Sequence, residues 1–151
     1  MWRAAQLTVA VLMAGGCGGG SAGSLSSATP TSEPSSQVVF QLEGTTPAAD
    51  SVRGGGGSGT FTLSGAVSDS GTFLDYRRQK GESIVIRRVL TGKTGKLTMV
   101  IHISTSSGDK GWRVVSGSGA YAGAHGRGDE SGGVDGSGNL SITMNGSLTG
   151  T

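Results

Sequence analysis

The stretch Ser83–Thr105, which reads SIVIRRVLTGKTGKLTMVIHIST, decides the fold. In each half, apolar side chains recur at every second residue: Ile84, Ile86 and Leu90 in the first half, and Leu97, Met99, Ile101 and Ile103 in the second. A period of two is typical of a β-strand with one buried face. The short Gly92–Gly95 segment between the halves has the composition of a turn. The stretch therefore predicts an antiparallel hairpin.

The same alternation recurs along the chain. It covers residues 58–67 and 139–148, with a shorter strand at Trp112–Ser116. Gln37–Gly44 is either a first strand or an apolar patch in a linker, and we favour the strand because Val38, Phe40 and Leu42 would share one face. No segment has the apolar spacing of an amphipathic helix. Many short strands on tight turns predict an all-β protein: a small closed antiparallel barrel of about eight strands.

The composition excludes several classes of protein. Glycine occupies 30 of the 151 positions without a Gly-X-Y period, which excludes collagen. The net charge of +2 is too small for a nucleic-acid surface, so we expect no nucleic-acid partner. The one cysteine excludes an internal disulfide and a cysteine-based metal site.

The N-terminus has the pattern of a signal peptide. Arg3 precedes an apolar stretch of about 11 residues, too short to span a bilayer, and Gly15 and Gly16 are small residues suited to peptidase cleavage. Cys17 follows them, and the segment resembles a bacterial lipoprotein signal, although Ala14 stands where an aliphatic residue is usual. The resemblance implies cleavage before Cys17 and attachment of lipid to it. The alternative is a secretory signal cut at the same bond.

Three parts follow from this pattern. Residues 1–16 are the expected signal peptide, residues 17–36 carry the lipidated Cys17 and a Gly/Ser-rich flexible tether, and residues 37–151 form the barrel domain. The strand pattern is strong from residue 58. We expect an extracytoplasmic protein held at the cell membrane by the lipid, or a soluble secreted one if the cysteine is not modified.

The glycine-rich segment Ser116–Gly128, SGSGAYAGAHGRG, surrounds one aromatic residue, Tyr121. Such glycines permit tight turns, and the aromatic ring is expected to plug a barrel end. With Met144–Gly150 after it, the segment resembles the C-terminal half of the allene oxide cyclase and dirigent-like barrels, which belong to the calycin-like group. The resemblance covers about residues 58–151 and implies an eight-stranded barrel. It carries over no catalytic residue, because this chain has no matching motif in its N-terminal half.

Five residues are candidates for contacts with a ligand in the lumen or with an anion: Tyr76, Arg87, Arg88, His102 and Tyr121. Arg87 and Arg88 are adjacent, so on a strand they point to opposite faces. An inward arginine needs a partner. The alternative is a solvated hairpin end with cross-strand pairs to Asp75 or Glu82.

The two histidines, His102 and His125, have no acidic residue at ligand spacing, so we expect no metal site and no cofactor. Three functions remain open. The first is a non-catalytic barrel that binds a small apolar ligand or an envelope partner. The second is an isomerase or cyclase acting in the lumen, and the third is a purely structural envelope protein. An open lumen with an inward polar group would favour the first two.

Overall fold

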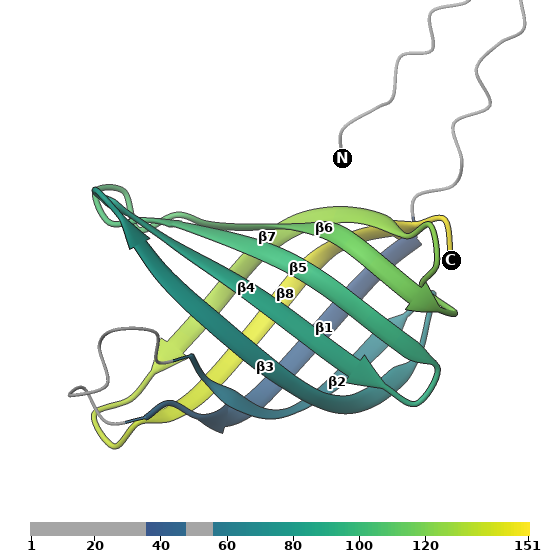
Figure 1. Ribbon diagram of the computed structural model, residues 1–151, viewed down its shortest axis with the longest axis horizontal. Helices are drawn as coiled ribbons and strands as arrows, with labels where there is room; N and C mark the ends of the chain where they lie inside the picture. The colour runs from purple at the N-terminus through teal and green to yellow at the C-terminus, as the bar shows by residue number, and fades with distance from the viewer. Residues whose placement is uncertain (1–35, 48–55) are drawn as a thin grey trace, which may run out of the picture. The chain divides into compact units, whose positions relative to one another are not determined.

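The computed structural model describes residues 36–47 and 56–151, and within these ranges it contains strands and turns but no helix. Each strand pairs antiparallel with the next, and the last pairs with the first, so the sheet closes into a barrel (Figure 1). The expected all-β barrel of about eight strands is confirmed. The strands are β1 (Ser36–Thr45), β2 (Ser58–Gly65), β3 (Asp69–Lys80), β4 (Ser83–Gly92), β5 (Gly95–Ser104), β6 (Lys110–Gly119), β7 (His125–Val134) and β8 (Asn139–Thr149).

The favoured strand at Gln37–Gly44 is confirmed, because β1 pairs with both β2 and β8 and closes the barrel. Other strand predictions need correction. The strand predicted at 58–67 ends earlier, at Gly65, whose positive φ of 113° begins the turn. The short strand predicted at Trp112–Ser116 extends over all of β6, and the alternation of apolar residues missed β3 and β7. Cys17, the expected signal peptide and nearly all of the tether lie outside the described residues.

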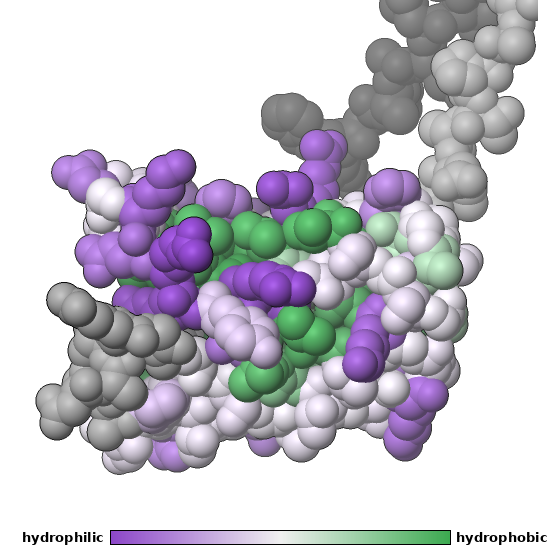
Figure 2. Space-filling model, viewed as in Figure 1, coloured by the Kyte–Doolittle hydropathy of each residue, from purple (hydrophilic) through white to green (hydrophobic). Residues whose placement is uncertain are grey.

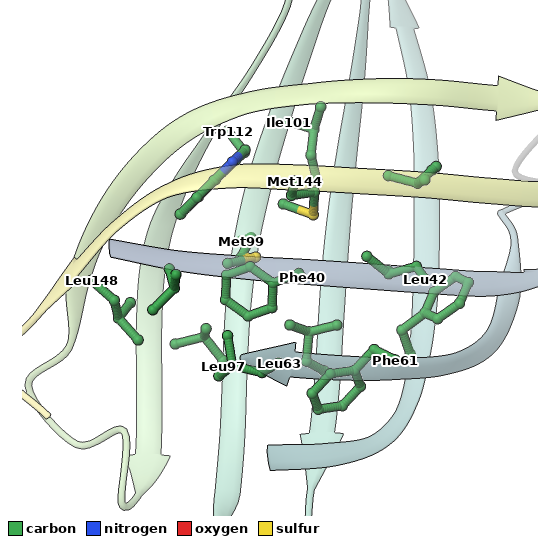
Figure 3. Packing of buried hydrophobic residues seen from close by; sticks show 14 of the residues in the cluster. Phe40, Leu42, Phe61, Leu63, Leu97, Met99, Ile101, Trp112, Met144 and Leu148 are labelled. Atoms are coloured by element: carbon green, nitrogen blue, oxygen red, sulfur yellow. The ribbon is translucent and has the colours of Figure 1, made fainter. Parts of the chain in front are cut away.

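The barrel interior is filled by the side chains of one parity from every strand. Phe40 of β1 meets Trp112 of β6 edge to face, with ring centroids 5.7 Å apart and an angle of 83° between the rings (Figure 3). Around this pair lie aliphatic and sulfur-containing side chains that are almost fully buried: Val38, Leu42, Leu63, Leu90, Leu97, Met99, Ile101, Met144 and Leu148. Their burial is the main source of the barrel's stability.

The seam between β6 and β7 is the most weakly paired of the eight. It holds only three residue pairs, from Gly111↔Asp129 to Arg113↔Arg127, and β6 bulges against β5 near Met99. Glycines let bulky groups fit beside this seam. A Cβ on Gly146 would lie 2.5 Å from Cζ2 of Trp112 and 2.8 Å from Cα of Gly128, so the indole occupies the space that a side chain would take.

The two ends of the barrel differ. We call one the Tyr121 end, because it contains Tyr121 and the turns at 66–68, 93–94 and 120–124. Tyr121 is 2% exposed, and its hydroxyl donates a 2.8 Å hydrogen bond to Asp69 Oδ2. We call the other the cavity end, which carries the turns at 81–82, 105–109 and 135–138. The aromatic plug therefore lies at one end, and the other end remains to accept a ligand.

Candidate functional site

A cavity of about 710 Å³ opens at the cavity end of the barrel. Its walls come from inward-facing aliphatic side chains on β4, β5 and β8: Ile84, Ile86, Ile103, Leu140 and Ile142. The volume falls within the usual range of about 300–1,000 Å³ for small-molecule sites, which are mostly apolar with a few fixed polar groups. The alternation that builds the core thus continues into the walls of the cavity.

The floor of the cavity is an ionic cluster built around Arg88, which is fully buried. Its Nε and Nη2 donate to the two carboxylate oxygens of Asp75, both at 2.8 Å, in a bidentate pair. Its Nη1 donates to Oε2 of Glu130 at 2.7 Å and also contacts the sulfur of Met144 at 3.1 Å. Asp75 lies directly opposite Arg88 in the β3–β4 register, whereas Glu130 reaches it from β7.

Arg88 remains charged in this interior position. Burial by itself lowers the pKa of its guanidinium, but the hydrogen bonds and charges of Asp75 and Glu130 more than offset this and raise the pKa above its ordinary value. The guanidinium carbon also lies 5.6 Å from the centre of the Phe73 ring, a cation–π distance. Each nitrogen of the guanidinium therefore already has a partner within the protein.

The cluster contains one more carboxylate than it has guanidinium groups. Asp75 is 4% exposed and Glu130 8% exposed, and both line the cavity. Among the described residues, none donates a hydrogen bond to Oε1, the second carboxylate oxygen of Glu130. That part of the chain also has no buried side-chain oxygen or nitrogen without a partner, so Oε1 is not sealed inside protein. With formal charges, the floor carries a net charge of minus one.

Polar and charged side chains surround the mouth of the cavity. Arg77 and Gln79 continue the inward parity of β3 beyond Asp75, and Lys110 begins β6. Lys110 donates to the carbonyl oxygen of Gly132, which ties β6 to β7 where their strand pairing has ended. Asp135 of the 135–138 turn also lines this end, so the rim carries two cations and one carboxylate, with an aliphatic middle and a floor rich in carboxylate below it.

Of the five predicted contact residues, only Arg88 reaches the cavity. Tyr76, Arg87 and His102 have the outward parity of their strands and lie exposed on the outer surface, where Arg87 stacks over Tyr76 at 6.0 Å. Strand alternation turns these three side chains away from the lumen, and contact with an anion, the other half of the prediction, stays a prediction. Tyr121 is buried but lies at the Tyr121 end, away from the cavity lining.

Apolar side chains also gather on the outside of the barrel. Figure 2 shows green side chains over the front strands, among hydrophilic ones. Leu74 and Tyr76 of β3 are 44% and 51% exposed, and Val115, the extra residue at the β6 bulge, is 52% exposed. Leu74 and Tyr76 are neighbours on the outer face of β3, whereas Val115 lies on β6, with β4 and β5 between them.

Sequence reasoning found part of the ionic cluster. The alternation gave Arg88 the parity of Ile84, Ile86 and Leu90, but Asp75 was named as a partner only for a solvated hairpin end. Glu130 was missed because the inward positions of β7 are Gly126, Gly128 and Gly132, which give no apolar alternation. The glycines themselves have a period of two, and Glu130 occupies the position between Gly128 and Gly132 in that series.

The described residues also bear on metal binding and on helical membrane spans. Among the described residues, no group of three or more His, Cys, Asp and Glu side chains is arranged to hold a metal ion. No helix in the described ranges is long and apolar enough to cross a membrane. No protein-family model, curated protein or solved structure matches this chain. The function is therefore argued from the geometry of the site.

Proposed function

We propose that this chain is a lipid-anchored, extracytoplasmic bacterial protein whose barrel binds a small, largely apolar ligand without transforming it. The observation that carries the binding proposal is the cavity of about 710 Å³ with aliphatic walls and a buried ionic floor. Apolar walls would supply affinity by removing ligand surface from water, and the polar floor would fix the ligand's orientation.

The ionic floor is itself an argument for binding. Burying charges costs free energy, and apolar side chains of similar volume commonly stabilise a core as well as or better than a buried ion pair. The Tyr121 end of the same barrel is packed without any ion pair. A cluster at the bottom of an opening, where a ligand can meet it, therefore supports recognition over packing.

A dye-binding experiment tests this function. Nile red, an uncharged dye that fluoresces in apolar surroundings, should bind the full chain at one site per barrel. Ile86→Trp, which fills the cavity from β4, should weaken binding at least tenfold. Val85→Trp is the matched control, because the neighbouring residue of the same strand has the outward parity and should leave binding unchanged.

The other two functions are outcomes of the same experiment. If no apolar probe binds, or if both tryptophan variants bind equally well, the cavity is not a binding site and the structural role is favoured. If a bound ligand is recovered chemically altered, the isomerase or cyclase alternative is favoured instead. The outward apolar side chains of Leu74, Tyr76 and Val115 favour binding of an envelope partner as a second candidate.

The lipid anchor rests on the sequence around Cys17. Two or more acyl chains hold a protein stably at a membrane, and a polar tether leaves the barrel free of the surface. In its own host the protein should partition into the detergent phase, and Cys17→Ser should release it or leave the precursor uncut. Wild-type protein found in the culture medium with a free N-terminal thiol would favour the secreted alternative.

A further inference from the structure

We infer that the cavity selects ligands with a cationic or hydrogen-bond-donating group at the buried end, such as a primary amine on an apolar chain, and rejects carboxylates. The inference rests on the proposed binding function and names the ligand class of the same site. It comes from the balance of donors and acceptors at the floor, where the ligand's inner end would lie.

The guanidinium of Arg88 is already engaged by two carboxylates. Its Nε and Nη2 are held by Asp75 at 2.8 Å, and its Nη1 is held by Glu130 at 2.7 Å. A ligand carboxylate at the floor would lie beside both of them and would make three carboxylates for one guanidinium. Like charges repel strongly where little water screens them, so we expect such a ligand to be rejected.

The negative charges at the floor, by contrast, outnumber the positive one. Two carboxylates meet one guanidinium, and Oε1 of Glu130 accepts no hydrogen bond from any described residue. Glu130 is more than nine-tenths buried and lines the cavity, so a donor on the ligand could meet it away from bulk water. Hydrogen bonds to charged groups contribute more than those between neutral groups, and a cation would also offset the net negative charge.

The walls and rim agree with this assignment. Between floor and mouth the lining is aliphatic, from Ile84, Ile86 and Ile142, so the middle of the ligand is apolar. The cations Arg77 and Lys110 lie at the mouth, where they disfavour a second cationic group and leave the amine to the floor. The sign of charge thus changes along the cavity, from positive at the rim to negative at the floor.

A matched series of ligands tests the inference on the unmodified site. Decylamine, decan-1-ol and decanoate share one alkyl chain and differ only in the head group. Their affinities for the full chain carrying Cys17→Ser, which excludes a lipid of its own, can be measured by displacement of Nile red. Decylamine should bind about tenfold or more tightly than decanoate, with the alcohol between them.

Two variants test whether Glu130 causes the preference for the amine. Glu130→Gln keeps the size of the side chain and removes one negative charge, and it should reduce the preference for the amine about tenfold. Asp129→Asn removes the same charge from the outward-facing neighbour on β7 and should leave the preference unchanged. A shift of the Arg88 side-chain Nε–H resonance on adding decylamine, but not decanoate, would place the head group at the floor.

The outcomes separate the two proposals. If none of the three ligands binds, the binding function fails. If decanoate binds as tightly as decylamine, the cavity binds ligands but the head-group assignment is wrong. If Glu130→Gln and Asp129→Asn lower the amine preference equally, the preference comes from overall charge and the assignment is also wrong. The wild-type series gives its answer even if Glu130→Gln does not fold.

Discussion

The two halves of this barrel are built by the same strands and end differently. Toward the Tyr121 end, the inward positions hold buried aromatic and aliphatic side chains, with Tyr121 hydrogen-bonded to Asp69. Toward the cavity end, the same strands turn Asp75, Arg88 and Glu130 inward and leave a cavity of about 710 Å³. The comparison teaches that one half maintains the fold, whereas the other half departs from good packing where a ligand would lie.

The largest effect is expected from Arg88. Arg88→Ala would leave Asp75 and Glu130 buried without a counterion, and breaking such a cluster by removing one member costs about 3–5 kcal/mol of the free energy of unfolding. Urea denaturation followed by circular dichroism measures this loss. A loss below about 1 kcal/mol would show that the carboxylates are not held by the guanidinium.

The matching variant replaces the whole cluster by apolar residues. The triple variant Arg88→Met, Asp75→Leu and Glu130→Met makes the cavity end resemble the Tyr121 end in chemistry. It should be at least as stable as the parent, since no charge remains to be buried, while its preference for amine ligands disappears. If it is much less stable, the cluster supports the fold and the contrast between the halves is weaker than we infer.

Tyr121 tests the other half. Tyr121→Ala removes a nearly fully buried aromatic side chain and should cost about 3–5 kcal/mol, because the packed end cannot collapse around the space. Tyr121→Phe keeps the ring and loses one hydrogen bond to Asp69, at about 1 kcal/mol. Both should bind Nile red like the parent, since Tyr121 does not line the cavity. Thermal melting distinguishes the two variants by their melting temperatures. Equal melting temperatures for Tyr121→Ala and the parent would contradict the role of Tyr121 in packing that end of the barrel.

The sequence predicted the packed half better than the open half, for a physical reason. Alternation is visible only where inward positions are apolar, as at Leu97, Met99 and Ile101 of β5. In β3 the inward positions after Phe73 are polar, and in β7 they are mostly glycine, so neither strand has the period of a buried face. These strands supply Asp75 and Glu130. The inward positions of β3 and β7 that contribute to the ionic cluster are therefore the ones that remove the apolar alternation by which a strand is recognised.

Arg88 shows how much of the ionic cluster can be predicted from the pattern of one strand. Its parity with Ile84, Ile86 and Leu90 predicts an inward side chain, and the register across the β3–β4 turn brings Asp75 opposite. Glu130 approaches only because the barrel closes through β7 and β8, a long-range arrangement that no local pattern encodes. Tyr76, Arg87 and His102 were named as contacts for a lumen ligand or an anion, and the alternation of their own strands places them on the outer face.

The smallest effect is the dependence of stability on pH at the Tyr121 end. Burial by itself raises the pKa of Asp69, but hydrogen bonds from Tyr121, from Thr94 and from the Ser70 and Lys93 amides outweigh it and lower the pKa to about 2, from 3.8. A carboxyl with a lower pKa in the folded state stabilises the fold above the unfolded pKa, and that contribution is lost as the pH falls from 3.8 toward about 2. Burial, joined by the Asp69 carboxylate, raises the pKa of Tyr121 from 10.0 to about 12, so its contribution is present below pH 10 and is lost as the pH rises toward 12.

Asp69→Asn should flatten the acid side of the stability profile and Tyr121→Phe the alkaline side, each relative to the parent in urea titrations across the pH range. Asp129→Asn, an exposed carboxylate on β7, is the control and should leave both sides unchanged. An acid side that Asp69→Asn leaves as steep as the parent's would mean that the Tyr121–Asp69 contact does not hold that end of the barrel.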